Sequence, residues 1–454
     1  MQKIREHWSS HLGFILAAAG SAIGLGTLWK FPYIAGENGG GIFVFIYLLC
    51  TLFVGIPVFI AELVLGRCAQ RGAVGTFAKL SNNSGTWKFA GWLSVLSSFL
   101  IMSYYSVIGG WGLNYILMSL MQSYKNMDSQ KIAHLFDALY SSADINLFWH
   151  FLFTGIVILL VLPGVRQGVE YWSKFMMSGL FILLFALFIY ALLTMDGFSE
   201  AISFLFAPNP AKFKPSGALE ALGLSLFTLS LGQGIMLTYG SYMRKTEDIP
   251  KTGLIIGAMI VSVALLAGLT IFSIIFTFDF SPEQGRGLIF KTLPLLFTKL
   301  PGSLLISTIF FVLLVFAALT SAIAFIEVIA ANMMDLYGWT RPKAVWTTGL
   351  MCFLFGIPSA LSGSGLLFAN WPLIFGTTFF ATVDDLVSTW LLPIAALMIS
   401  IYTGWFFDPV LQSEEFTSGT SLKNWFPVWA FFIRWVSPAA IILIILQQSG
   451  LIHF

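Results

Sequence analysis

Two apolar stretches of the chain are interrupted by glycine and serine in a way that could create a binding site. The first, residues 12–32, has Gly20, Gly24 and Gly26 near its centre and ends at Pro32. Glycine in a helix interior costs roughly 1 kcal/mol relative to alanine, so this composition favours either close packing of another helix or a break in the helix. A break would leave backbone carbonyls free to bind a cation and N–H groups free to bind an anion.

The second interrupted stretch covers residues 222–242 and carries the segment 230–234 (SLGQG) in the middle of an apolar run. Two broken spans at corresponding positions of two halves of a chain indicate a transporter built from inverted repeats, with its binding site between the breaks. We therefore predict discontinuous transmembrane helices 1 and 6 around one central site.

The composition defines the class of protein that must position these breaks. Of 454 residues, 57% are hydrophobic and 10% are charged, whereas a soluble domain carries about 25% charged residues. The chain is therefore predicted to be an all-α membrane protein. Its net charge of +2 implies no polyanionic partner such as a nucleic acid. Neither the cysteines and histidines nor any nucleophile–base pattern suggests an enzyme or an organic cofactor.

Hydropathy predicts about 11 transmembrane helices. They cover residues 12–35, 41–68, 88–121, 147–163, 170–194, 222–242, 251–279, 303–333, 344–361, 372–404 and 425–447. Residues 281–302 are expected to form a helical loop on the surface.

The expected organisation is a 5+5 inverted repeat followed by one additional helix. Its parts are an N-terminal segment (1–11), a first repeat (12–195), an extracellular loop (196–218), a second repeat (219–405), and a loop with the eleventh helix (406–454). Lysine and arginine in short loops gather on the side of the N-terminus, for example Arg5, Arg67, Arg166 and Arg244. This bias predicts that the N-terminus is cytoplasmic.

Short motifs identify a family. Residues 5–8 (REHW), 20–26 (GSAIGLG), 37–41 (ENGGG), 227–234 (FTLSLGQG) and 317–327 (AALTSAIAFIE) resemble the neurotransmitter:sodium symporter family, and the resemblance runs through spans one to ten in order. It implies a bacterial amino-acid symporter of the inner membrane that alternates access around a central site and uses sodium ions.

The resemblance places one sodium site on Gly20, Ile23, Ala317, Thr320 and Ser321. Sodium is a hard cation suited to oxygen ligands, and three backbone carbonyls with two hydroxyls would supply five. The alternative is that the two hydroxyls only bond back to their own helix.

A further sodium site of the family would use Ala22, Thr27 and Thr228, but this site is doubtful. Its fourth position is Ile260, which offers no oxygen, and the chloride-related position of the seventh span is Ala264. We therefore expect one functional sodium site and no response to chloride.

The resemblance also implies a substrate pocket. Its lining would be Ser21, Ala22, Gly24, Gly26, Ile101, Tyr105, Phe227, Ser230, Gln233, Ser321 and Phe325. Gly24 stands where monoamine transporters of the family carry an aspartate, so the substrate should bring its own carboxylate. First-span N–H groups and Tyr105 would bind that carboxylate, and carbonyls of spans one and six would bind the amine.

Gln233 is the polar exception in a wall that is otherwise apolar and aromatic. A buried amide without a partner costs roughly 1–3 kcal/mol, so Gln233 needs a hydrogen bond. It either bonds the unwound backbone near Gly232 and Gly234, or an ordered water, or it bonds a polar group of the substrate.

Charged residues inside a membrane protein are expensive and usually functional. By resemblance, Lys30 and Asp384 form an outer gate. The matching inner gate consists of Arg5, Trp8, Ser241, Tyr242 and Asp335. Lys30 could instead be a solvated surface residue. Glu62 is expected to hold the unwound backbone of span six, and Glu327 has no obvious cation in the sequence.

Together these features predict a sodium-coupled importer of a neutral amino acid, apolar or aromatic, that works by alternating access as a monomer or loose dimer in the lipid bilayer. A proton-coupled or uncoupled amino-acid transporter on the same fold is the first alternative. A non-transporting amino-acid sensor is the second.

Overall fold

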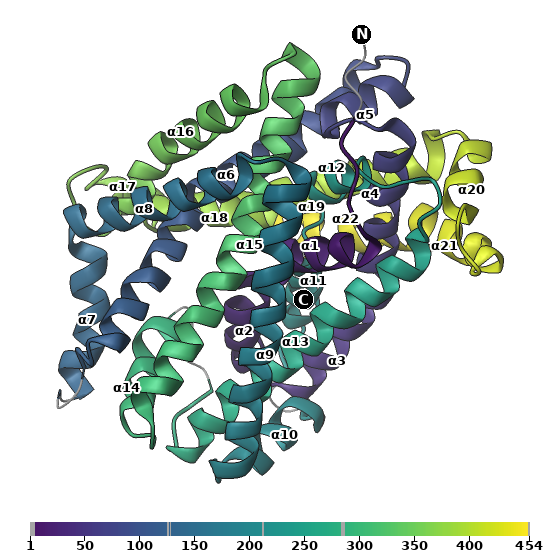
Figure 1. Cartoon of the computed structure of the whole chain (residues 1–454). Coiled ribbons are helices and arrows are strands. Elements are labelled where there is room, and N and C mark those ends of the chain that lie inside the picture. The colour runs from purple at the N-terminus through teal and green to yellow at the C-terminus, as the bar shows by residue number, and fades with distance from the viewer. Residues whose placement is uncertain (1–4, 125–126, 128, 211–212, 283–286, 453–454) are drawn as a thin grey trace.

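The computed structural model describes residues 5–124, 127, 129–210, 213–282 and 287–452. Regular structure in this part of the chain is entirely helical (Figure 1). The first half contains α1 His11–Ala22, α2 Phe31–Glu37, α3 Gly41–Cys50, α4 Ile56–Ala69, α5 Ala73–Leu80, α6 Gly85–Leu120, α7 Ser129–Ser141, α8 Ala143–Val161, α9 Tyr171–Thr194 and α10 Phe198–Phe206. The second half contains α11 Ser216–Thr228, α12 Ile235–Gly240, α13 Ile249–Thr277, α14 Leu293–Thr298, α15 Ser303–Tyr337, α16 Arg341–Ala360, α17 Trp371–Phe375, α18 Phe379–Asp385, α19 Leu392–Ile401, α20 Pro409–Thr417, α21 Phe426–Phe431 and α22 Ser437–Gln448.

Several long helices contain a single π-helical turn that ends two residues before a proline. Proline has no N–H, and its ring clashes with the carbonyl four residues earlier; a π-turn is one local rearrangement that accommodates such a break in the ladder. The helix therefore bends and continues. The pairs are Gly26–Lys30 with Pro32, Thr51–Gly55 with Pro57, Leu288–Thr292 with Pro294, Leu386–Leu391 with Pro393, and Phe432–Val436 with Pro438.

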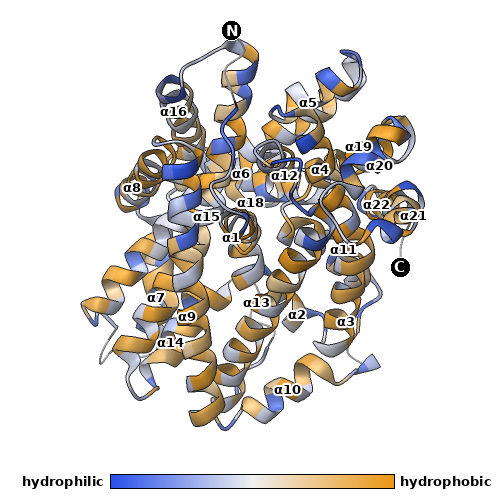
Figure 2. Cartoon of the chain, turned by 45° about the vertical axis from the view of Figure 1, so that its right-hand side comes forward, coloured by the Kyte–Doolittle hydropathy of each residue, from blue (hydrophilic) through white to orange (hydrophobic). Residues whose placement is uncertain are grey.

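Eight helices of the described chain are long and apolar enough to cross a membrane, and a ninth span results if the bent pair α1 and α2 is counted as one. These helices are hydrophobic along most of their length (Figure 2). Two further predicted spans fall on α16 and on the broken pair α11 and α12. The total of about 11 spans and the repeat boundaries stay predictions.

Two predicted elements differ from the structure. The tenth span begins at Phe379, not at residue 372, because Gly376 adopts a left-handed conformation and the side chain of Thr378 caps the new helix. The segment 281–302 is helical as predicted, but in its described part Leu288, Phe290 and other apolar residues are buried. It is therefore a packed element and not a loop on the surface.

The two longest helices, α6 and α15, pack against each other at the centre of the molecule, and α1 contacts α15, α9 and α13 (Figure 1). The short α12 packs on α4 and α15. Both interrupted stretches therefore lie inside the bundle, surrounded by continuous helices.

A buried arginine joins the end of α4 to α20. The fully buried Arg67 donates from Nε to Glu415 Oε2 at 2.9 Å and from Nη1 to the Glu247 carbonyl at 2.6 Å. Lys245 bonds the other carboxylate oxygen of Glu415. The loop after α12 is thereby tied to the segment between α19 and α21.

Replacing Arg67 by alanine should destabilise the fold by about 3–5 kcal/mol, because a carboxylate would remain buried with only part of its pairing. The apparent melting temperature of the purified protein in detergent measures this loss. The double variant Arg67→Met, Glu415→Leu removes both charges and should melt close to wild type. If the double variant melts as low as Arg67→Ala, the loss of stability is not caused by the unpaired carboxylate of Glu415.

Candidate substrate and ion site

The first helix breaks directly after Ala22. The next residue, Ile23, leaves helical geometry with a ψ of 71°, and the two helical segments on either side of the break are bent by 51°. The Ser21 carbonyl is thereby available to other helices and accepts hydrogen bonds from the hydroxyls of Ser230 and Ser321, each at 3.0 Å. The glycines therefore serve both a helix break and close helix packing. The close packing is seen at Gly20, where a Cβ would lie 2.9 Å from a side-chain carbon of Met177.

The second break covers residues 229–234, between α11 and α12. Ser230, Gly232 and Gly234 all have positive φ values, between 56° and 73°, a conformation that glycine adopts without strain. The Gly232 N–H donates to Glu62 Oε1 at 2.8 Å. Glu62 therefore lies where the sequence placed it, against the unwound backbone.

A small cavity lies between the two breaks. Ten of the eleven predicted substrate residues line it, namely Ser21, Ala22, Gly24, Gly26, Tyr105, Phe227, Ser230, Gln233, Ser321 and Phe325. The eleventh, Ile101, is fully buried but is not part of the lining. A Cβ on Gly24 would lie 2.4 Å from Ser321 Oγ and 2.6 Å from the Tyr105 hydroxyl oxygen, so only glycine leaves this cavity open.

The lining of the cavity is uncharged among the described residues. Its polar groups are hydroxyls, one carboxamide and the backbone of the breaks, and the Leu25 N–H donates to the Tyr105 hydroxyl at 2.9 Å. Such a site can hold a zwitterion through dipoles and hydrogen bonds. The open volume is only about 10 Å³, so a ligand enters only if the surrounding side chains move apart.

Four of the five oxygens of the predicted sodium site lie close together beside this cavity. Ser321 Oγ lies 3.2 Å from the Ala317 carbonyl and 3.5 Å from the Gly20 carbonyl, and Thr320 Oγ1 lies 3.0 Å from the Ala317 carbonyl. Ile23 is the first residue beyond α1. The hydroxyls bond to their own helix, as the alternative interpretation expects, but Ser321 also reaches across to α1.

The two threonine hydroxyls of the doubtful first sodium site already have hydrogen-bond partners within the protein. Thr27 Oγ1 donates to the Ala22 carbonyl at 3.3 Å, and Thr228 Oγ1 lies 3.0 Å from the Tyr47 hydroxyl. Ile260 is fully buried. The threonine oxygens are thus present but form hydrogen bonds within the protein. The fourth ligand position is occupied by the aliphatic side chain of Ile260.

The outer gate pair is formed. Lys30 Nζ lies 2.7 Å from Asp384 Oδ1 and 4.2 Å from the centre of the Phe227 ring, which borders the cavity. Tyr104 and Ser388 also donate to Asp384. Both charged side chains are largely buried, so Lys30 is not a solvated surface residue.

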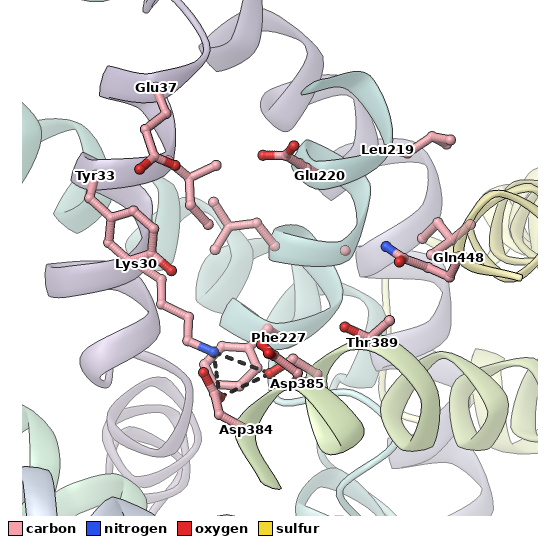
Figure 3. Close-up of a pocket in the computed structure, with 15 residues that line it drawn as sticks. Lys30, Tyr33, Glu37, Leu219, Glu220, Phe227, Asp384, Asp385, Thr389 and Gln448 are labelled. Carbon is pink, nitrogen blue, oxygen red and sulfur yellow. Dashed lines mark hydrogen bonds and ion pairs between the residues drawn. The ribbon is translucent and has the colours of Figure 1, made fainter. Parts of the chain in front are cut away.

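A second and larger cavity, of about 380 Å³, lies beyond this pair (Figure 3). Figure 3 shows Lys30 and Asp384 at one end of it beside Phe227, with the acidic residues Glu37 and Glu220 farther along the wall. We call this larger cavity the vestibule. Phe227 lines both the vestibule and the small cavity, and Lys30 of the predicted gate pair lies over its ring.

The inner gate is formed as well. Arg5 Nη1 lies 2.7 Å from both carboxylate oxygens of Asp335, and its Nε and Nη2 donate to Ser241 Oγ. The guanidinium stacks on Tyr242 at 4.8 Å, and Trp8 packs edge-on against the same ring. The five residues predicted for the inner gate therefore meet in one cluster.

The sequence missed the partner of Glu327. Arg341 Nη2 donates to Glu327 Oε2 at 2.6 Å, and the Tyr242 hydroxyl donates to Glu327 Oε1 at 2.7 Å. Burying an unpaired charge is costly, so a cation near Glu327 could be expected, and Arg341 at the start of the next helix was the available signal.

Comparisons with known proteins agree with this geometry. The model of the sodium:neurotransmitter symporter family matches residues 5–142 and 129–453. An uncharacterised sodium-dependent transporter of Bacillus subtilis is 40% identical over 448 residues, which cover 98% of each chain. The chain belongs to the sodium:neurotransmitter symporter family.

Further relatives support this membership. An uncharacterised sodium-dependent transporter of Methanocaldococcus jannaschii is 32% identical over 98% of this chain and 91% of its own. The crystal structure of MhsT in complex with L-phenylalanine has a TM-score of 0.90 and 37% identity, and the match covers 98% of this chain and 100% of that one. The predicted family and the all-α membrane fold are confirmed.

Replacing Lys30 by arginine should slow opening of the outer gate about twofold to fivefold, because a planar guanidinium holds a carboxylate with two parallel hydrogen bonds and an ammonium does not. The measurement is the rate at which a membrane-impermeant thiol reagent modifies a cysteine introduced at Ser230, in a background without native cysteines.

Lys299→Arg is the matched control, because the Lys299 ammonium lies over the rings of Phe278 and Phe280 and the residue lines neither the vestibule nor the small cavity. Asp384→Ala should have the opposite effect and speed labelling. If Lys30→Arg and Asp384→Ala both leave the rate unchanged, the pair is not a gate.

Proposed function

We propose that this member of the family is a sodium-coupled symporter that imports a neutral amino acid, apolar or aromatic, by alternating access. The observation that carries the proposal is the cavity between two helix breaks, with hydroxyl and carbonyl oxygens of α1 and α15 beside it. The ion pairs Lys30–Asp384 and Arg5–Asp335 support it, because they join the residues predicted as gates. A solved relative with L-phenylalanine bound supports an amino acid as the substrate class.

Recognition of the substrate follows from the uncharged lining. A carboxylate fits the Tyr105 hydroxyl and the adjacent backbone N–H of Leu25, which already bond to each other. An ammonium group fits the carbonyls that the breaks expose, such as that of Ser21. Phe227 lies between the cavity and Lys30, so a bound substrate would press on the ring that carries the outer gate.

Coupling to sodium rests on Ser321. Its hydroxyl borders the cavity, bonds the Ser21 carbonyl, and also lies against the carbonyls of Gly20 and Ala317. A sodium ion held by these oxygens and by Thr320 would fix α15 against the end of α1. The ion would thereby shape the wall on which the substrate binds, and release of either one would loosen the other.

We infer a single functional sodium site. The hydroxyls of Thr27 and Thr228 have internal partners, and the fully buried Ile260 supplies no oxygen in place of a ligand. Burying a cation with an incomplete oxygen shell is unfavourable. Ala264 at the chloride-related position supports independence from chloride.

The proposal places the protein in a bacterial inner membrane as a monomer or loose dimer, with a cytoplasmic N-terminus. Uptake of radiolabelled amino acids into proteoliposomes, with and without an inward sodium gradient, tests it. Uptake that needs the gradient supports symport. Uptake without sodium would favour the proton-coupled or uncoupled alternative, and binding without uptake would favour a sensor.

Thr320→Ala should weaken the sodium dependence of substrate binding about tenfold or more, because a cation ligand is lost, whereas Thr27→Ala should leave it unchanged. Both side chains are buried threonines, so each variant controls for the other. The measurement is equilibrium binding of a labelled amino acid as a function of sodium concentration.

The wild-type sodium curve should have a Hill coefficient near one, and replacing chloride by gluconate should not alter it. A coefficient near two that persists in Thr320→Ala would contradict the single-site inference. Loss of sodium dependence in Thr27→Ala would instead move the functional site to the other position.

A further inference from the structure

Gln233 carries a hydrogen-bonding group that the protein itself leaves unused. The residue lies in the break between α11 and α12, is 1% exposed, and lines the cavity. Its backbone carbonyl accepts a hydrogen bond from Ser98 Oγ at 2.5 Å, which fixes the residue in place. Its side-chain Oε1 is buried and has no hydrogen-bond partner among the described residues.

The neighbouring polar groups are already occupied. The Gly232 N–H donates to Glu62, the Ser230 hydroxyl to the Ser21 carbonyl, and the Ser321 hydroxyl to carbonyls of α1 and α15. The local backbone bond that the sequence left open for Gln233 is therefore not formed by these groups. Buried polar groups normally have partners, so an unpartnered carboxamide oxygen on a residue that lines a cavity points to a ligand.

Three aromatic residues also line the cavity. Phe227 and Phe325 line the cavity with Gln233, and the rings of Tyr105 and Phe325 meet edge-to-face with centres 5.5 Å apart. Ring pairs prefer such offset or edge-on arrangements, so a third ring fits against this corner. Oε1 is an acceptor and requires a donor from the ligand.

We propose that the substrate is a neutral aromatic amino acid with an N–H or O–H group on its ring, an indole or a phenol, and that Gln233 accepts a hydrogen bond from this group. The proposal rests on the amino-acid transport function proposed above and deepens it. A site built to bond a polar group rejects analogues that lack the group, so phenylalanine should bind more weakly than tyrosine or tryptophan.

The test is equilibrium competition by unlabelled amino acids at saturating sodium, with the full-length protein in detergent. The labelled probe is whichever of tryptophan, tyrosine, phenylalanine or leucine binds best to the wild type. On wild type, tyrosine or tryptophan should compete about tenfold or more better than phenylalanine, the discrimination expected when one buried hydrogen bond is lost.

Gln233→Met keeps the size of the side chain and removes the acceptor. It should erase this preference while binding of phenylalanine is kept or improved, and that retained binding also shows that the variant is folded. Gln448→Met is the matched control, because Gln448 lines the vestibule and not the cavity. This variant should preserve the wild-type ranking.

Two results would overturn the inference and leave amino-acid transport standing. One is a wild type that binds phenylalanine as well as tyrosine and tryptophan, or a ranking led by leucine or glutamine. The other is a ranking that Gln233→Met does not change. If the wild-type protein neither binds any amino acid nor takes one up into proteoliposomes, both the proposed function and this inference are refuted.

Discussion

Backbone hydrogen bonding inside the bilayer is the constraint on which the structure depends. Hydrocarbon offers no partners to N–H and C=O groups, so a helix can be broken there only where other protein groups satisfy the freed backbone. The partners come from distant helices: Tyr105 bonds the Leu25 N–H, and Glu62 bonds the Gly232 N–H. The breaks and the helices around them therefore specify one another, and the site cannot form without the bundle.

The same constraint links the ion to the substrate. The carbonyls released where α1 ends are within reach of both the cavity and the oxygens of α15, because the break is only a few residues long. Ser321 bonds carbonyls on both sides of this junction. The proposed coupling therefore needs no long pathway, since the Ser321 hydroxyl would belong to both the proposed sodium site and the proposed substrate site.

Much of this arrangement could be predicted from the sequence, and the ion pairs that were missed depend on contacts between different helices. Glycine and serine within apolar stretches located the breaks, because the cost of glycine in a helix is local. The pairing of Arg67 with Glu415 and of Arg341 with Glu327 was not predicted, because it depends on which helix ends meet in space. The start of α18 at Phe379 was also missed, although the Gly376 conformation and the Thr378 cap are local signals.

Some features of the candidate site could likewise be predicted from the sequence, and others could not. The residues around the cavity were found by resemblance to a family, and the structure brings ten of them together. The residue types alone do not predict that the hydroxyls of Thr27 and Thr228 bond to Ala22 and Tyr47. Nor do they predict that the side-chain oxygen of Gln233 has no hydrogen-bond partner among the described residues. Both facts depend on side-chain directions within a few ångströms, which only the packed bundle fixes.

The π-turns before proline also bear on the outer gate, because both of its sides are built on them. Lys30 is the last residue of the turn at Gly26–Lys30, and Asp384 lies two residues before the first residue of the turn at Leu386–Leu391. A π-turn holds one residue more than an α-helical turn, and each residue rotates a helix by about 100°. Whether Lys30 and Asp384 face each other therefore depends on the number of residues in each π-turn. The loss of one residue from either turn would rotate one charge away from the other while leaving every residue type in the gate unchanged.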